Sequence, residues 1–201
     1  MTEKEFPTWD DFYRNNEVEE MPWFERNLDE DIRKAIEFHN IINGKFLDLG
    51  TGPGTQAMQL TKLGFDVVGS DLSDHAIKRA QNLYPKTSYV VDDILNSKFK
   101  DNEFDFIFDR GVFHVFEQDK IPAYINQITR ILKKNGFLFL KCMSIEEKGM
   151  EDGEGPYLYS KKQIRDIFGK NFEIKSIIDS VYFGTLNPLP KSLFAVMVNK
   201  K

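Results

Sequence analysis

Short apolar runs alternate with amphipathic stretches along most of the chain. The apolar runs have the length of buried strands and lie at residues 45–50, 65–71, 87–91, 103–111 and 137–143. The amphipathic stretches repeat apolar side chains at helical spacing, at residues 28–42, 55–64, 74–84, 122–136 and 160–169. Strands that alternate with helices of this length predict a mostly parallel sheet with helices on both faces. The expected fold is therefore a three-layer, doubly wound α/β domain.

Local signals mark the ends of these elements. Asp29 and Ser73 can act as N-caps of the helices that follow them, and Gly136 is expected to end the helix before it. Near the C-terminus, extended segments at residues 172–184 and 192–200 are separated by a short loop. Because a parallel crossover needs about a dozen residues, this loop predicts an antiparallel hairpin at the end of the sheet.

Composition narrows the class of protein and of partner. The chain has 201 residues, 41% of them hydrophobic, which suits one domain over residues 1–201 with a substantial core. Its formal charge is −5 and its basic residues are scattered, which argues against a nucleic-acid partner and favours small molecules or proteins. We expect a monomer or a weak dimer.

The cysteine content and the length of the apolar segments indicate where in the cell the protein is located. The single cysteine, Cys142, excludes an intramolecular disulfide and a paired-cysteine zinc site, and no metal is expected. The N-terminus lacks the basic start and apolar run of a signal peptide. No segment approaches the ~20 apolar residues of a transmembrane helix. These features predict a cytoplasmic protein without membrane contact.

The most informative stretch is FLDLGTGPGT, residues 46–55, directly after a predicted strand. Its three glycines permit positive φ angles and let a ligand approach the backbone, although a tight turn without a ligand is an alternative. The G-x-x-G spacing of a dinucleotide site is missing, and Pro53 removes one N–H group that a phosphate would use. The acid at Asp48 suits a cation. The loop therefore favours a ligand with an ammonium group over one with a pyrophosphate.

The sequence D-L-G-T-G-P-G resembles motif I of the class I S-adenosylmethionine-dependent methyltransferases. The resemblance extends from about Leu47 to the C-terminus. It implies S-adenosyl-L-methionine as the cofactor. It also implies a Rossmann-like sheet of seven strands, mostly parallel, with the last strand antiparallel. In that family this loop wraps the methionine part of the cofactor. The residues assigned to this role here are Asp48, Gly50, Thr51, Gly52 and Gly54.

Two acidic positions after predicted strands fit the same family. Asp71 closes the second strand, where a carboxylate can accept both ribose hydroxyls, with a helix cap or turn as the alternative. The resemblance places Leu72 against the adenine. After the third strand, the family pattern of an acid before an apolar residue favours Asp93 with Ile94 near the adenine amino group. We expect Asp92 to be a solvated loop charge.

Asp109, Arg110 and Gly111 end the fourth predicted strand, where motif IV of the family faces the transferring methyl group. The sequence Asp-Arg-Gly at this position resembles that of the thiopurine methyltransferase and tellurite-resistance branch of the family, which acts on small, polarisable nucleophiles. Arg110 can pair with Asp109 or orient an anionic substrate. His114 is a candidate general base or substrate contact because of its near-neutral pKa, and a packed histidine is the alternative.

The N-terminal pattern W-D-x-x-Y…P-W resembles the segment that closes over the cofactor in the same branch. The resemblance implies a lid at residues 1–28, with Trp23 at the cofactor, and a Rossmann-like core at residues 29–201. Aromatic side chains can shield a sulfonium and wall a pocket. The candidates are Trp9, Tyr13, Trp23, Phe113, Phe116 and Tyr157.

The leading interpretation is an S-adenosylmethionine-dependent methyltransferase that methylates a small-molecule nucleophile, such as a thiol, by in-line displacement. A protein lysine acceptor and a non-catalytic module that binds S-adenosylmethionine are the alternatives. A nicotinamide dehydrogenase is disfavoured by Pro53 and by the glycine spacing. The acceptor depends on the geometry of the lid and of the loop at residues 144–157.

Overall fold

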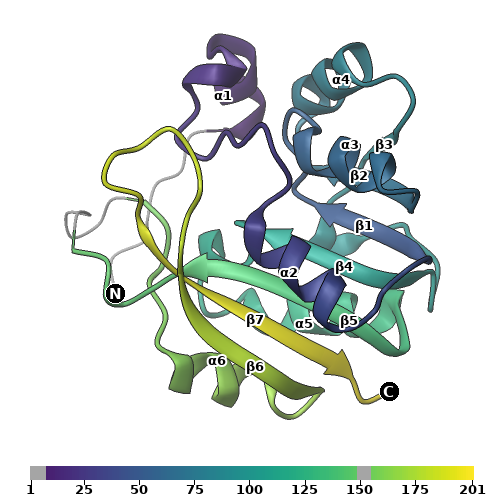
Figure 1. Cartoon of the computed structure of the whole chain (residues 1–201), viewed down its shortest axis with the longest axis vertical. Coiled ribbons are helices and arrows are strands. Elements are labelled where there is room, and N and C mark those ends of the chain that lie inside the picture. Colours follow the sequence, from purple (N-terminus) through teal and green to yellow (C-terminus); the bar gives the residue numbers. More distant parts are fainter. Residues whose placement is uncertain (1–7, 149–154) are drawn as a thin grey trace.

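Seven strands form one sheet in the computed structural model, which describes residues 8–148 and 155–201 (Figure 1). The strands are β1 (Lys45–Leu49), β2 (Asp66–Asp71), β3 (Ser88–Val91), β4 (Phe104–Arg110), β5 (Leu132–Met143), β6 (Phe172–Val181) and β7 (Lys191–Asn199). Their order is β3-β2-β1-β4-β5-β7-β6, and β7 runs antiparallel to both of its neighbours while the other pairs are parallel. The expected Rossmann-like sheet with its C-terminal hairpin is confirmed.

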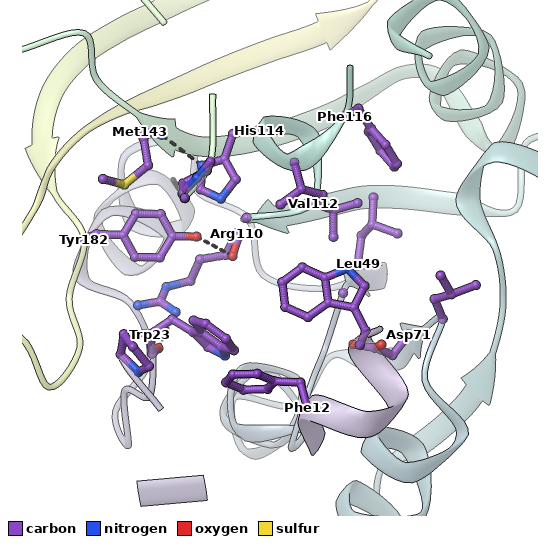
Figure 2. Close-up of a pocket in the computed structure, with 18 of the residues that line it drawn as sticks. Phe12, Trp23, Leu49, Asp71, Arg110, Val112, His114, Phe116, Met143 and Tyr182 are labelled. Carbon is purple, nitrogen blue, oxygen red and sulfur yellow. Dashed lines mark hydrogen bonds between the residues drawn. The ribbon is translucent and has the colours of Figure 1, made fainter. Parts of the chain in front are cut away.

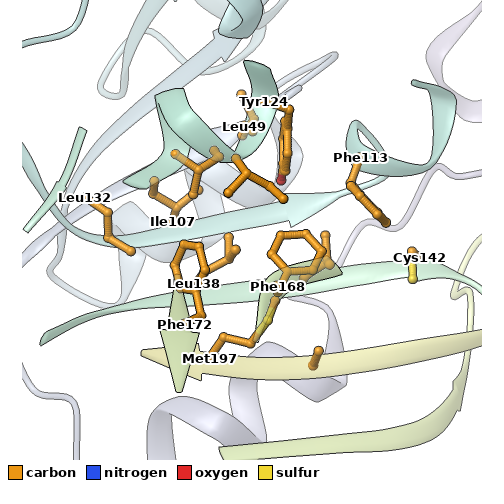
Figure 3. Close-up of a cluster of buried hydrophobic side chains, with 14 of the residues drawn as sticks. Leu49, Ile107, Phe113, Tyr124, Leu132, Leu138, Cys142, Phe168, Phe172 and Met197 are labelled. Carbon is orange, nitrogen blue, oxygen red and sulfur yellow. The ribbon is translucent and has the colours of Figure 1, made fainter. Parts of the chain in front are cut away.

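Helices cover both faces of this sheet. They are α1 (Trp9–Asn15), α2 (Glu30–Phe38), α3 (Thr55–Lys62), α4 (Asp74–Leu83), α5 (Ile121–Ile131) and α6 (Lys161–Phe168), with short 3₁₀ turns at Val18–Glu20, Ile94–Asn96 and Phe113–Val115. On one face, Ile32 of α2 and Leu60 of α3 share a buried cluster with Phe46. On the other, Phe168 of α6 joins Leu138 in a larger cluster that also includes α5 (Figure 3). The alternation of side chains along each strand supplies both layers.

N-caps set the starts of two helices as expected. Asp29 accepts a hydrogen bond from the Asp31 N–H group (3.0 Å) at the start of α2. Ser73 accepts one from the Ala76 N–H group (3.1 Å) at the start of α4. In each case the side chain satisfies an amide that has no partner within the helix.

The helix predicted at residues 122–136 is shorter than expected at its end. It stops at Ile131, and β5 begins at once with Leu132, which is fully buried and pairs with Phe104 on β4. The pairing register then shifts, and Asn135 takes a φ of 60°. Strand pairing and burial of Leu132 therefore outweigh the helical pattern, because helix propensity is a weak preference that tertiary contacts override.

The N-terminal segment, residues 8–28, lies against the end of the sheet where the parallel strands have their carboxyl termini. Its helix α1 lies beside α4, apart from the layer formed by α2 (Figure 1). Open α/β sheets bind ligands at this end of their strands. Within the described ranges, no helix has the length and apolar character needed to cross a membrane.

Candidate active site

A cavity of about 500 Å³ opens at the carboxyl ends of β1, β2 and β4 (Figure 2). The strand ends and the turns after them contribute Leu49, Gly50, Asp71, Leu72, Asp92, Asp93, Ile94, Arg110, Gly111, Val112, His114, Val115 and Phe116. The N-terminal segment contributes Trp9, Phe12, Tyr13, Pro22 and Trp23. The C-terminal half contributes Met143, Gly155, Pro156, Tyr182, Leu186 and Pro190. The lining is mostly apolar, with a few polar groups near the strand ends, as is usual for small-molecule sites.

Four aromatic side chains of the N-terminal segment form a roof over the cavity. This aromatic roof consists of Trp9, Phe12, Tyr13 and Trp23. The ring centroids of Trp9 and Trp23 are 6.0 Å apart, and those of Phe12 and Trp23 are 5.1 Å apart. Such tilted and edge-on contacts stabilise aromatic pairs beyond the burial of their area. The roof therefore forms one connected cluster.

The glycine loop after β1 contacts both the cavity and the roof. Gly50 lines the cavity, and its φ of 68° and the closeness of Val112, 2.2 Å from where a Cβ would lie, exclude a larger residue. A Cβ on Gly52 would lie 2.7 Å from the Tyr13 hydroxyl oxygen. Thr51, Gly52 and Gly54 are not among the residues that line the cavity. The close approach of the roof is thus one reason for the glycines.

Asp48 lies behind this loop and not in the cavity. Its Oδ2 atom accepts hydrogen bonds from the Thr51 hydroxyl (2.5 Å) and from the Ala57 N–H group (3.0 Å). Burial raises the pKa of Asp48 to about 6, and the hydrogen bond from Thr51 opposes that effect. This carboxylate holds the loop to the first turn of α3, and a direct contact between Asp48 and the cofactor stays a prediction.

Asp71 lies at the tip of β2 and lines the cavity. One of its oxygens accepts a hydrogen bond from the Gly52 N–H group (2.9 Å) and the other from the Ser73 N–H group (2.9 Å). Burial raises the pKa of the Asp71 carboxyl to about 6. Each carboxylate oxygen has a second lone pair that can accept a ligand hydroxyl. Leu72 beside it is 58% exposed and also lines the cavity.

Of the two adjacent acids after β3, the structure buries Asp92 and exposes Asp93. Asp93 is exposed, and its Oδ1 atom accepts a hydrogen bond from the Leu95 N–H group (2.9 Å). Asp92 is buried, so the interpretation of a solvated charge is wrong. Its Oδ1 atom accepts from the Lys98 N–H group (2.9 Å), whereas its Oδ2 atom is buried without a hydrogen-bond partner among the described residues. Both acids and the buried Ile94 line the cavity.

Asp109 is fully buried and does not line the cavity. It accepts hydrogen bonds from the Gly111, Val112 and Phe113 N–H groups at 2.8 to 3.0 Å and from the Tyr124 hydroxyl at 2.6 Å. Burial raises the pKa of Asp109 to about 6, against the effect of these hydrogen bonds. These hydrogen bonds show that Asp109 shapes the turn after β4, and its contact with the reacting groups stays a prediction.

Arg110 pairs with Asp29 and not with Asp109. Its Nε atom lies 2.9 Å from Asp29 Oδ2, and its Nη1 atom donates to the Trp23 carbonyl oxygen at 2.9 Å. Its Nη2 atom donates to the Phe183 carbonyl oxygen. The side chain of Arg110 is 7% exposed. The alternative in which Arg110 pairs with Asp109 is thus wrong, because successive residues of β4 point to opposite faces of the sheet.

His114 is buried and lines the cavity next to Tyr182 (Figure 2). Its Nδ1 atom accepts a hydrogen bond from the Met143 N–H group at 3.0 Å. The neutral ring therefore carries its proton on Nε2, and this edge of the ring is a hydrogen-bond donor. That arrangement favours a contact to the substrate over the role of general base, since the lone pair that a base would use is engaged by the backbone.

Several wall residues differ from the sequence prediction. Of the six predicted aromatic side chains, Trp9, Tyr13, Trp23 and Phe116 line the cavity. Phe113 is instead fully buried in the core against Phe168, and Tyr157 lies outside the cavity lining. Phe12, Met143, Tyr182 and Leu186 were not predicted. Lys141, inside the apolar run FLFLKCM, is a sign in the sequence that buried charge lies behind this wall.

No metal-binding arrangement is found in the part of the chain that the structure describes. Within residues 8–148 and 155–201, no group of three or more His, Cys, Asp or Glu side chains is placed to hold an ion. By contrast, the lining is suited to S-adenosylmethionine: two carboxylates with free lone pairs border an apolar, aromatic cavity beside a glycine turn.

Known proteins match this chain at the level of sequence. The model of a family described as "Methyltransferase domain" matches residues 46–136. EEF1A lysine methyltransferase 2 of Mus musculus is 24% identical, over 86% of this chain and 68% of that protein. Thiocyanate methyltransferase 1 of Brassica oleracea is 27% identical, over 80% of this chain and 73% of that protein.

Solved structures match the fold. One is the subject of work on the conversion of a disulfide bond into a thioacetal group during echinomycin biosynthesis. It has a TM-score of 0.81 at 23% identity and covers 95% of this chain and 90% of its own. A TehB-like methyltransferase from Corynebacterium glutamicum has a TM-score of 0.65 at 22% identity and covers 83% and 86%.

The sheet order, the glycine loop after β1 and the matches to both sequence and structure define a class I methyltransferase fold. S-adenosylmethionine is the cofactor of proteins of this class. The chain is accordingly an S-adenosylmethionine-dependent methyltransferase. Its relatives divide between small-molecule and protein-lysine acceptors.

Proposed function

We propose that the protein transfers the methyl group of S-adenosylmethionine to a small-molecule nucleophile, with a thiol or another soft nucleophile as the acceptor class. The observation that supports this most is the aromatic roof, which covers a cavity of about 500 Å³. Pockets of roughly 300–1,000 Å³ enclose ligands of small-molecule size. An acceptor has to share this space with the cofactor, which favours a compact molecule.

In this proposal the cofactor lies across the ends of β1, β2 and β3. Asp71 would accept the ribose hydroxyls, and Leu72 and Ile94 would pack against the adenine. Asp93 would accept from the adenine amino group, and Asp92 is a second candidate because its Oδ2 atom is buried without a partner among the described residues. Gly50 would lie against the methionine part, with Trp23 above it.

The acceptor would lie between the roof and the wall formed by His114, Met143 and Tyr182. When bound, the cofactor supplies an electrophilic methyl group on a sulfonium. The protein has to hold the nucleophile about 3–3.5 Å from it and exclude water. The aromatic rings serve both purposes and favour the positive charge of the sulfonium. A soft nucleophile needs only to be deprotonated, so the lack of a free base on His114 does not prevent transfer.

The finer resemblance to the thiopurine methyltransferase and tellurite-resistance branch supports the same acceptor class. Trp9, Tyr13 and Trp23, which carry that resemblance in the sequence, all belong to the roof. The relative named for thiocyanate and the TehB-like structure point in the same direction.

A lysine side chain of a protein is the second candidate acceptor. The relatives named for EEF1A lysine methylation, at 23–25% identity, favour it. A lysine side chain would have to reach the methyl group through the roof, so this function requires that the N-terminal segment opens. Non-catalytic binding of S-adenosylmethionine is the remaining alternative.

The test is transfer of a labelled methyl group from S-adenosylmethionine to three acceptor sets: a panel of small thiols, a panel of small amines and phenols, and the proteins of a cell lysate. We expect the label in the thiol panel, and Asp71→Asn should abolish most of it. Label that enters lysate proteins alone would support the lysine alternative. Cofactor binding without transfer in any set would contradict the proposed activity.

A further inference from the structure

Four charged side chains form a buried cluster beneath the N-terminal segment. Asp29 at the start of α2 lies between Arg110 at the end of β4 and Lys141 of β5, with Nε–Oδ2 and Nζ–Oδ2 distances of 2.9 and 2.7 Å. Lys141 Nζ also lies 2.7 Å from Asp31 Oδ2. The side chains of Lys141 and Asp29 are 0% exposed, and that of Asp31 is 10% exposed. Two positive and two negative charges thus compensate each other inside the protein.

Compensation is the condition under which such charges can be buried at all. An ionised group without a partner is very unfavourable in the protein interior. Burial alone would raise the pKa of Asp29, but Lys141 and Arg110 hold it below its usual value. Tyr182 and Phe183 contribute ring faces, 4.8 Å from the Arg110 guanidinium and 4.7 Å from Lys141 Nζ. Side chains from several elements therefore combine to stabilise the buried charges of this cluster.

Arg110 connects this cluster to the cavity. Its guanidinium donates to the carbonyl oxygens of Trp23 and Phe183, and its own carbonyl oxygen accepts from the Tyr182 hydroxyl (2.5 Å). Trp23 belongs to the aromatic roof, and Tyr182 forms the facing wall (Figure 2). Asp29 is not among the residues that line the cavity, and its ion pair with Arg110 joins it to one that is.

We propose that Asp29 is a positioning residue: by orienting the Arg110 guanidinium, it holds Trp23 and the adjoining loop between β6 and β7 together at the edge of the pocket. The description of that space as the acceptor's rests on the proposed function. The positioning itself does not, since it can be measured with the product S-adenosylhomocysteine alone.

The sequence provides a spectroscopic reporter for this test. Trp9 and Trp23 are the only tryptophans of the chain, and both lie in the roof. In a Trp9→Phe background, all tryptophan emission comes from Trp23. Quenching by acrylamide with and without S-adenosylhomocysteine then reports how well the bound roof is closed, and the titration gives the dissociation constant.

The decisive variant is Arg110→Lys, because lysine keeps the positive charge but loses the fork that reaches Asp29, Trp23 and Phe183 together. Asp29→Asn is the second variant. Arg33→Lys and Glu30→Gln are matched controls, since Arg33 and Glu30 form an exposed ion pair on α2, the helix that Asp29 caps. Thermal melting of each variant shows whether it is folded at the assay temperature.

We expect Arg110→Lys and Asp29→Asn to weaken binding of S-adenosylhomocysteine by about tenfold or more, the usual scale for loss of a charged hydrogen bond. We also expect Trp23 to stay accessible to acrylamide in their complexes, while the controls behave as the parent. Parent-like binding and quenching in both variants would overturn the proposal. So would melting of both below the assay temperature, because the cluster would then serve stability alone. Failure of the thiol panel with these results intact would reject only the acceptor class.

Discussion

The two ends of the N-terminal segment are anchored to the core by contacts of opposite character. At α1, Asp10 accepts hydrogen bonds from the Ser73 hydroxyl (2.9 Å) and the His75 N–H group (3.1 Å), at the start of α4. We call this contact the exposed anchor, because the side chains of His75 and Asp10 are 36% and 40% exposed. At the other end of the segment, the pair of Asp29 and Arg110 is almost fully buried.

The difference indicates how the roof can open without loss of the fold. Exposed ion pairs and hydrogen bonds contribute little and compete with water, whereas a buried charge network is strongly destabilising to break. We therefore expect the α1 end of the roof to open for ligands while the Trp23 end stays fixed. Roof opening from α1 would let both cofactor and acceptor enter without breaking the buried cluster.

The largest effect on stability is expected from a substitution in the buried charge cluster. Lys141→Met preserves the length of the side chain but leaves Asp29 and Asp31 with Arg110 as their only buried cation among the described cluster residues. We expect the free energy of unfolding to fall by about 3 kcal/mol, at the low end for a broken buried pair. Urea denaturation measures it.

The control for that variant is Lys162→Met on α6, where the lysine is 84% exposed and pairs with Asp166. Its unfolding free energy should change by about 0.5 kcal/mol or less. Equal effects of the two substitutions would remove the distinction between a buried and an exposed anchor.

An intermediate effect, on cofactor binding, is expected at Asp71. Ser73 contacts both Asp71 and Asp10, so Asp71 is linked to the exposed anchor as well as to the ligand site. Asp71→Asn should weaken S-adenosylhomocysteine binding by roughly 10- to 100-fold, since a charged hydrogen-bond acceptor is lost. Calorimetric titration at neutral pH measures this change. An Asp71→Asn protein that binds as tightly as the parent would exclude the ribose contact.

The same carboxyl predicts a pH dependence of binding. Burial raises the pKa of Asp71 to about 6 in the free protein, so it becomes protonated as the pH falls through that value. The raised pKa stabilises the free fold below the ordinary pKa of 3.8 and loses this contribution as the pH rises through about 6. Binding needs the ionised form, so affinity should fall as the pH drops below about 6. Asp48 and Asp109 share this range, and the part due to Asp71 is the difference between parent and Asp71→Asn.

The smallest effect is expected at the exposed anchor. The His75 N–H group and the Ser73 hydroxyl lower the pKa of Asp10 from 3.8 to about 2. A lowered pKa contributes stability that is present above pH 3.8 and is lost as the pH falls toward 2, so α1 should stay docked at neutral pH. Asp10→Asn should change S-adenosylhomocysteine affinity by only about two- to fivefold. Emission from Trp9 in a Trp23→Phe background should show greater acrylamide access, and unchanged access would mean that Asp10 does not hold α1.

The fold and the position of the glycine loop and Asp71 at the strand ends could be predicted because their signals are local in the chain. The glycine loop and Asp71 each lie within a few residues of a strand end, where the geometry follows from the element itself. The burial of Asp92 and the exposure of Asp93 could not be predicted, since they depend on which side chain the turn at Ile94–Asn96 buries. Asp48 and Asp109 are acids of the same kind, yet their hydrogen bonds turn them away from the cavity.

The buried cluster and the acceptor wall could not be predicted, because their residues are far apart in sequence. Asp29 is 81 residues from Arg110 and 112 from Lys141. Periodicity describes each segment alone and does not reveal which charges meet across the sheet. A lysine within an apolar strand indicates that some buried acid is needed, but not which one.

We expect the cofactor to bind under the aromatic roof with its ribose on Asp71. The most direct measurement is a crystal structure of the complex with S-adenosylhomocysteine. It should show both ribose hydroxyls within hydrogen-bond distance of the Asp71 carboxylate and the sulfur facing the space between Trp23 and Tyr182. A ligand bound outside the roof, or one with its ribose away from Asp71, would exclude this binding mode.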